Sequence, residues 1–138
     1  MPNICIIGLG NPGRKYDGTR HNVGKDWVKN IATECHLKLQ SKKKIESTVA
    51  VSTDEKILWG YPNKYVNESG HSINKILKND NFKLEQVLVI HDDLDLPIGS
   101  LKLKIGGGHG GHNRLRSIIS HSGKPFIRLR VGIGHPGN

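Results

Sequence analysis

Continuous apolar runs and helix-spaced apolar residues alternate along the chain. Residues 3–8 (NICIIG) and 86–91 (QVLVIH) are short, mainly apolar runs, which are typical of strands buried on both faces. Residues 25–35 and 69–78 carry apolar side chains at helical spacing, so each stretch predicts an amphipathic helix. Residues 47–61 predict a hairpin, because STVAVST and KILWGY flank a short polar pair.

Weaker patterns predict a turn, two more strands and a third helix. The basic residues 40–44 (QSKKK) indicate a solvated turn. Residues 100–105 (SLKLKI) alternate like a strand with one wet face, and 126–134 (FIRLRVGIG) like a strand with alternating arginines. Apolar residues between 115 and 119 predict a helix directly after a glycine-rich segment, with Gly123 placed to end it.

These elements predict the α/β class, as a single three-layer domain over residues 1–138 with a mixed, largely parallel sheet flanked by helices. No stretch approaches the eighteen or so apolar residues of a membrane span, and the N-terminus lacks the pattern of a secretory signal. Cys5 and Cys35 show neither CxxC nor zinc-like spacing. We therefore expect a cytoplasmic protein with two reduced thiols.

The charge balance points to a polyanionic partner. Lys and Arg number 21 against 12 Asp and Glu, which gives a net charge of +9 and a pI near 9.7. Such an excess suits phosphate contacts, although it also suits a protein kept soluble by its charge. Aromatic residues make up only 5%, which disfavours a stacking platform for long single strands.

Residues 8–13 (GLGNPG) formally match the dinucleotide-binding fingerprint G-x-G-x-x-G after a strand. In that fingerprint the third glycine opens a helix, whereas here no helical period begins until about residue 24. A tight loop at the end of a strand is the preferred interpretation. It presents Asn11 and, ten residues later, His21.

Three further polar segments follow or connect predicted strands, and we expect all four at one edge of the sheet, where α/β folds keep their sites. They are residues 63–70, 91–97 and 106–113. Their polar side chains are Asn67, Asp92, Asp93, Asp95, His109, His112 and Asn113.

Two kinds of hydrolytic chemistry fit these residues. A metal site could draw its ligands from His21, His91, Asp92, Asp93, His109 and His112, but no HExxH-like signature is present. No G-x-S-x-G elbow supports a serine nucleophile. Asparagines instead suit hydrogen bonding to a developing oxyanion. This favours a histidine that activates water beside a carboxylate, without metal or cofactor, on an ester or amide attached to a polyanion.

Four segments resemble, in order and spacing, the signatures of bacterial-type peptidyl-tRNA hydrolases. They are GLGNPGRKYDGTRHNVG, NKYVNESG, HDDLDLPIGSLKLKIGGGHGGHNRLRSII and FIRLRVGIGHPG, and together they run from about residue 4 to 137. The resemblance implies cleavage of the ester between a peptide and the 3′ ribose of tRNA.

Site residues follow from the same resemblance. It makes His21 the catalytic base, Asp92 its support, and Asn11, Asn67 and Asn113 the amides. It places Tyr16 near the site, His112 at the tRNA end, and Lys104 and Arg130 on tRNA phosphate. We expect the glycine segment, including Gly110, to bring backbone amides close to the terminal nucleotides and peptide.

Two features depart from the family. Val66 stands where the family usually has methionine, which alters the apolar wall expected beside the base. The family also continues beyond GHPG with a lid-like segment and helices that cover the sheet. If the chain ended at Asn138, we would expect weaker tRNA affinity and lower stability.

The alternating cations predict how tRNA is held. Lys102 and Lys104 share one face of their strand, and Arg128 and Arg130 share one face of theirs. If the strands are neighbours, the four form one basic strip. We expect a monomer that binds peptidyl-tRNA; the alternative is a non-hydrolysing RNA-binding or RNA-processing relative.

Overall fold

The computed structural model describes residues 2–12, 19, 22–64, 68–105 and 126–134. Within these residues two α-helices, α1 (Val23–Glu34) and α2 (Ser69–Asn79), accompany seven strands. The strands are β1 (Ile4–Gly8), β2 (Gln40–Lys42), β3 (Ser47–Val51), β4 (Ile57–Pro62), β5 (Val87–Asp93), β6 (Leu101–Ile105) and β7 (Ile127–Gly132). All seven join one sheet in the order β2-β3-β4-β1-β5-β7-β6.

The centre of this sheet is parallel and its two edges are antiparallel. β4, β1, β5 and β7 run parallel to one another. β2 pairs antiparallel with β3, β3 with β4, and β6 with β7. The two apolar runs of the sequence form the central strands β1 and β5, which need apolar side chains on both faces. The predicted mixed sheet is confirmed.

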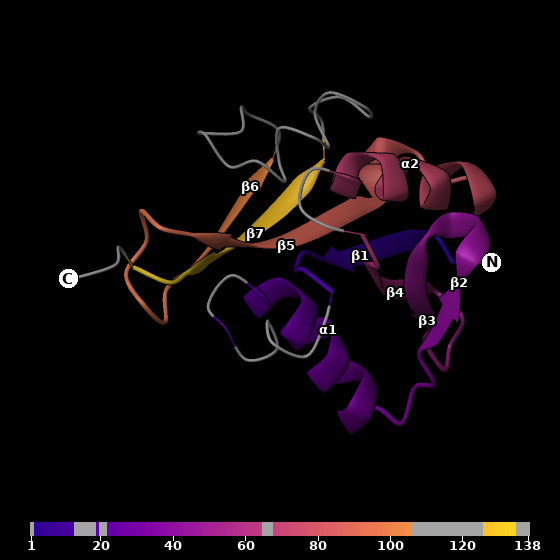
Figure 1. Ribbon diagram of the computed structural model, residues 1–138, viewed down its shortest axis with the longest axis horizontal. Coiled ribbons are helices and arrows are strands. Elements are labelled where there is room, and N and C mark those ends of the chain that lie inside the picture. Colours follow the sequence, from indigo (N-terminus) through magenta and orange to yellow (C-terminus); the bar gives the residue numbers. More distant parts are fainter. Residues whose placement is uncertain (1, 13–18, 20–21, 65–67, 106–125, 135–138) are drawn as a thin grey trace.

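Of the two described helices, α2 covers one face of the sheet and α1 the other, above and below it in Figure 1. On the α2 side, a core cluster includes Ile7, Val89 and Ile73. On the α1 side, a second cluster includes Ile6, Ile90 and Val28. Successive residues of β1 and β5 therefore point to opposite layers, as the twofold period of a strand requires. The predicted three-layer arrangement is confirmed.

The start of α1 lies directly against the sheet because two glycines leave room for it. A Cβ on Gly8 would lie 2.1 Å from the carbonyl oxygen of Gly24, and a Cβ on Gly24 would lie 2.2 Å from that of Ile90. Lys25 N–H donates to the Leu9 carbonyl at 3.1 Å. The backbone of α1 thus contacts the ends of β1 and β5 with no side chain between them.

Element boundaries differ from the predictions at several points. Helix α1 begins at Val23, two residues earlier than predicted, and β5 continues to Asp93. The prediction that residues 40–44 form only a turn is wrong, because Gln40–Lys42 pairs with β3 as a strand before the 3₁₀ turn Lys43–Ile45. Cys5 is buried as expected, but Cys35 is exposed. The predicted third helix lies outside the described residues.

Two further features complete the described part of the chain. A second 3₁₀ turn, Leu84–Gln86, leads into β5. No helix within the described ranges is long and apolar enough to cross a membrane.

Candidate active site

Asn11 and Asp92 lie at the same edge of the sheet. β1 and β5 are parallel neighbours with Gly8 opposite Ile90, so the residues that follow Gly8 come close to the end of β5. Asn11 follows β1. Asp92 lies near the end of β5, where it pairs with Val131 of β7. One amide and one carboxylate therefore both lie at the carboxyl edge of the central strands.

Asp92 lies on the α1 side of the sheet, because it is two residues beyond Ile90, whose side chain packs against α1. It is buried, with 5% of its surface exposed. His21 directly precedes Asn22 at the start of α1. Seven predicted site residues lie outside the described residues: Tyr16, His21, Val66, Asn67, Gly110, His112 and Asn113.

The side chain of Asn22 forms hydrogen bonds with both the N–H and the carbonyl of Asn11. Its Oδ1 accepts a hydrogen bond from Asn11 N–H at 2.8 Å, and its Nδ2 donates to the Asn11 carbonyl at 2.9 Å. Asn22 is fully buried. Asn22 was not among the site residues predicted from the sequence. An asparagine directly before a helix is ordinarily interpreted as an N-cap, yet Asn22 makes no side-chain cap hydrogen bond to α1.

Lys25, in the first turn of α1, contacts the same carbonyl. Its Nζ donates to the Asn11 carbonyl at 3.3 Å and lies 5.1 Å from the centre of the Tyr61 ring. Only 6% of Lys25 is exposed. A lysine charge is rarely buried unless carbonyl, carboxylate or ring partners surround it. Beyond the helical period, no pattern in the sequence indicates this role.

His91 lies on the other side of β5 from Asp92. It is buried, and its Nδ1 is 2.7 Å from the Asp92 carbonyl oxygen. This contact fixes the imidazole in place within the sheet. Among the described residues, no group of three or more His, Cys, Asp or Glu side chains is placed to hold a metal ion.

The predicted basic residues share one face of the β6–β7 pair. Lys102 is opposite Arg130, and Lys104 is opposite Arg128. The intervening residues point to the α1 side, where Leu101 and Val131 line a common pocket. This ribbon is therefore basic on one face and apolar on the other. The prediction that only one face of β6 is exposed to solvent is wrong. On the face opposite the lysines, Leu101, Leu103 and Ile105 are exposed as well.

The four cationic side chains of this face differ in how far they are exposed to solvent. Lys102 and Lys104 are exposed. Arg128 is 3% exposed, with its guanidinium 5.3 Å from the centre of the Phe126 ring, and burial lowers its pKa, as does the nearby charge of Arg130. The exposed positive charge of this face comes chiefly from the two lysines.

Arg130 is bound to a carboxylate. Its Nε donates to Asp93 Oδ2 at 2.6 Å. Burial alone would raise the pKa of the Asp93 carboxyl, but hydrogen bonds from Arg130 and Asp95 N–H, with the charges of Arg130 and His91, hold it below its usual value. The pair ties β7 to β5 and neutralises part of the basic face.

The expectation that four polar segments lie at one edge of the sheet stays a prediction for the glycine-rich segment, and the structure describes only where the strand before it ends. Because β6 is antiparallel to β7, it ends at Ile105 opposite Ile127, the first residue of β7. The chain therefore enters the glycine-rich segment from the opposite edge to Asn11 and Asp92. Residues 106–113 themselves lie outside the described residues.

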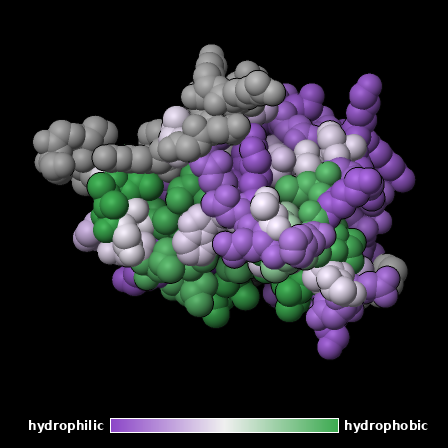
Figure 2. Space-filling model, turned by 90° about the horizontal axis from the view of Figure 1, so that it is seen from below, coloured by the Kyte–Doolittle hydropathy of each residue, from purple (hydrophilic) through white to green (hydrophobic). Residues whose placement is uncertain are grey.

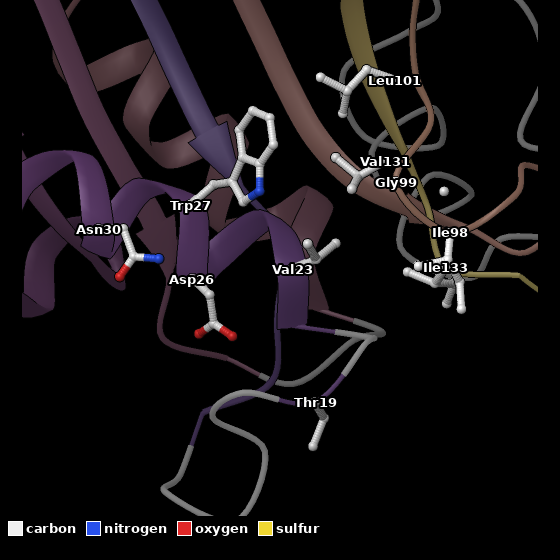
Figure 3. A pocket seen from close by; sticks show the side chains of 11 residues that line it. Thr19, Val23, Asp26, Trp27, Asn30, Ile98, Gly99, Leu101, Val131 and Ile133 are labelled. Atoms are coloured by element: carbon white, nitrogen blue, oxygen red, sulfur yellow. The ribbon is translucent and has the colours of Figure 1, made fainter.

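A pocket of about 510 Å³ lies on the α1 side, between α1 and the end of β7. Its walls are mainly apolar and include Val23, Trp27, Ile98, Leu101, Val131 and Ile133 (Figure 3). Hydrophobic atoms also gather on this side of the molecule in Figure 2. Neither Asn11 nor Asp92 lines the pocket, but Val131 and Gly132 in its wall pair with Asp92 and Asp93 at the end of β5.

Fold and charge together define an α/β protein with an amide and a buried carboxylate at one sheet edge and with exposed lysines on the β6–β7 pair, features suited to a polyanionic substrate. The family model described as peptidyl-tRNA hydrolase matches residues 5–138. The chain belongs to the peptidyl-tRNA hydrolase family.

Relatives and solved structures agree with this assignment. The chain is 47% identical to peptidyl-tRNA hydrolase of Rickettsia prowazekii and 44% identical to that of Rickettsia bellii; each match covers 98% of this chain and 74% of the relative. Crystal structures of peptidyl-tRNA hydrolase from Acinetobacter baumannii match with TM-scores of 0.92 and 0.91, at 42% and 41% identity. They cover 100% and 99% of this chain, and 72% and 70% of theirs.

Proposed function

We propose that this family member hydrolyses the ester bond between a peptide, or an N-blocked amino acid, and the 3′ end of tRNA. The reaction recycles tRNA from stalled translation. Family membership across nearly the whole chain carries the proposal. The placement of Asn11 and Asp92 at one sheet edge supports it, because the proposed mechanism uses an amide and a carboxylate at a common site.

In the proposed mechanism His21 is the base. Its imidazole takes a proton from water, the water oxygen attacks the ester carbonyl carbon, and the imidazolium returns the proton to the leaving 3′ oxygen as the ester bond breaks. Asp92 holds the imidazole and stabilises its charged form. Asn11 and Asn67 hydrogen-bond the substrate and its oxyanion, and no metal takes part.

Substrate contacts are assigned to five further residues. Tyr16 and Val66 form walls of the site, while Gly110, His112 and Asn113 contact the 3′ nucleotide and the peptide main chain. Amides and glycines recognise peptide groups rather than side chains, so we expect broad peptide specificity. Free aminoacyl-tRNA, with a charged α-amino group, should be a poor substrate.

The basic face of β6–β7 is proposed to bind the tRNA backbone. Exposed Lys102 and Lys104 make the main phosphate contacts. Arg128 and Arg130 support them from the opposite strand, and Arg130 is available to phosphate only in competition with Asp93. The chain is proposed to act as a monomer in the cytoplasm.

Turnover of N-acetyl-aminoacyl-tRNA tests the hydrolase against a non-hydrolysing RNA-binding relative. The wild-type chain should release tRNA, and His21→Ala should lower kcat on the order of 10²–10⁴-fold. RNA binding without turnover would support the relative instead. Activity that survives His21→Ala but is abolished by EDTA would support a metal mechanism.

A further inference from the structure

Three hydrogen bonds from the start of α1 converge on the peptide backbone of Asn11. Two come from the Asn22 carboxamide, at 2.8 and 2.9 Å, and one from Lys25 Nζ at 3.3 Å. Both side chains are buried. The Asn11 backbone is thus held on its N–H side and on its carbonyl side by one helix.

The surroundings of these side chains show that the contact is built into the loop. A Cβ on Gly10 would lie 2.9 Å from Asn22 Cγ and 2.7 Å from Lys25 Cβ, so only glycine leaves room for both. Asn22 also stands at the N-cap position of α1 without capping that helix. Its carboxamide serves the neighbouring loop in place of its own helix.

The Asn11 side chain makes this backbone anchorage important. Its Oδ1 is buried, and within the described part of the chain no donor reaches it. The position of the amide therefore depends on the backbone that Asn22 and Lys25 hold. His21, the proposed base, directly precedes Asn22 in the sequence, so the residue that anchors Asn11 is the chain neighbour of that base.

We infer that Asn22 and Lys25 are positioning residues of the hydrolytic reaction, which hold the Asn11 amide in register with His21. This inference rests on the proposed function. Small misplacements of a reacting group can lower turnover as much as 100-fold. The two residues act through Asn11, and neither needs to touch the substrate.

Steady-state kinetics on N-acetyl-aminoacyl-tRNA provide the first test. Asn22→Ala and Lys25→Met, which keeps the apolar stem, should each lower kcat about 10- to 100-fold and leave KM nearly unchanged. Asn22→Asp keeps the acceptor for Asn11 N–H and should retain more activity than Asn22→Ala. In an Asn11→Ala background, the effect of Asn22→Ala should largely disappear. Fully multiplicative effects in the double variant would overturn the inference.

Amide hydrogen exchange gives a readout that does not depend on activity. Asn22→Ala should accelerate exchange at Asn11 N–H, since that donor loses its acceptor. Gln86→Ala is the matched control, because the Gln86 carboxamide similarly accepts from Lys83 N–H and donates to the Asn3 carbonyl, both at 2.8 Å. That control should leave Asn11 exchange and kcat unchanged. Unaltered Asn11 exchange in Asn22→Ala would refute the inference.

Wild type and His21→Ala separate failure of this inference from failure of the proposed function. If wild type does not turn over, the function is wrong, while exchange at Asn11 still reports the anchorage. If wild type is active, His21→Ala is inactive, and Asn22→Ala behaves like Gln86→Ala, only the positioning role is wrong.

Discussion

Arg130 of β7 donates a 2.6 Å hydrogen bond from Nε to Asp93 Oδ2 of β5, on the sheet face that also carries Lys102 and Lys104. The side chains of the pair are 21% and 13% exposed, so water screens their attraction only in part. The pair therefore affects both the stability of the sheet and the charge of the face proposed to bind tRNA.

The stability of the chain should depend on pH through Asp93. The folded-state pKa of its carboxyl lies below the usual value. Its contribution is therefore complete above the unfolded pKa of about 3.9 and is lost as pH falls through the folded value. Asp93→Asn should destabilise by about 1–3 kcal/mol at pH 6, and by much less near pH 3. Urea denaturation at the two pH values measures this, and a difference independent of pH would contradict it.

Removing the exposed cations of β6 should weaken tRNA binding without changing the chemistry. Lys102→Ala with Lys104→Ala should raise KM for whole tRNA substrates and flatten the slope of log K against log[salt] by about 1.5, since each phosphate contact contributes about 0.7–0.9. A short 3′-end substrate should be unaffected. Lys43→Ala with Lys44→Ala, two exposed lysines near the opposite edge of the sheet, is the control. Equal damage to both substrates would place Lys102 and Lys104 in the reaction site.

Freeing Arg130 should have the opposite electrostatic effect. Asp93→Asn removes the carboxylate that Arg130 binds, so the guanidinium becomes available to phosphate. We expect the salt dependence of tRNA binding to steepen by up to about 1. Fluorescence anisotropy with labelled tRNA over a salt series measures the slope. An unchanged slope would show that Arg130 does not reach phosphate even when unpaired.

Gly24→Ala should be strongly destabilising. Alanine ordinarily stabilises a helix by up to about 1 kcal/mol over glycine. Here its Cβ would lie 2.2 Å from the Ile90 carbonyl oxygen, so the backbone of α1 or β5 must move. We expect a net loss of about 3 kcal/mol or more, with a fall in activity. Gly99→Ala is the comparison: its Cβ meets no atom within 4 Å and the cost, from a φ of +87°, should be about 1–2 kcal/mol. Denaturation midpoints that rank the variants in the opposite order would contradict the close approach.

The two thiols should differ sharply in reactivity. Burial, with the charge of Asp80, raises the pKa of the Cys5 thiol, which keeps it protonated and unreactive. Cys35 is exposed. Iodoacetamide on the folded chain should alkylate Cys35 alone, and Cys5 only after denaturation, as mass spectrometry of peptides will show. Rapid native labelling of Cys5 would contradict the described packing of β1.

Local patterns predicted the elements better than they predicted how the elements meet. The apolar runs of β1 and β5 and the periods of α1 and α2 are local, and the structure confirms them. Alternation predicts a strand but carries no information about direction. The antiparallel pairing of β6 with β7 was therefore not predicted.

The polar anchors of the site were missed for a related reason. Asn22 and Asn11 are 11 positions apart, and Arg130 and Asp93 are 37 apart. Hydrogen bonds over such separations depend on how loops and strands fold together. The resemblance to the family identified the residues expected to react. The side chains that hold those residues are identified only by the hydrogen bonds that they form in the folded chain.

The backbone contact of Gly8, Gly24 and Ile90 also limits how this enzyme can evolve. Most crowded substitutions in a core can be rescued by trimming a neighbouring side chain. Here the atoms that a new Cβ would meet are carbonyl oxygens, at 2.1 and 2.2 Å, and every residue type has those oxygens. A side chain at Gly8 or Gly24 thus has no second-site remedy in its immediate surroundings. Substitutions that alter the reaction must therefore occur elsewhere in the chain, while the backbone contact between α1 and the sheet stays unchanged.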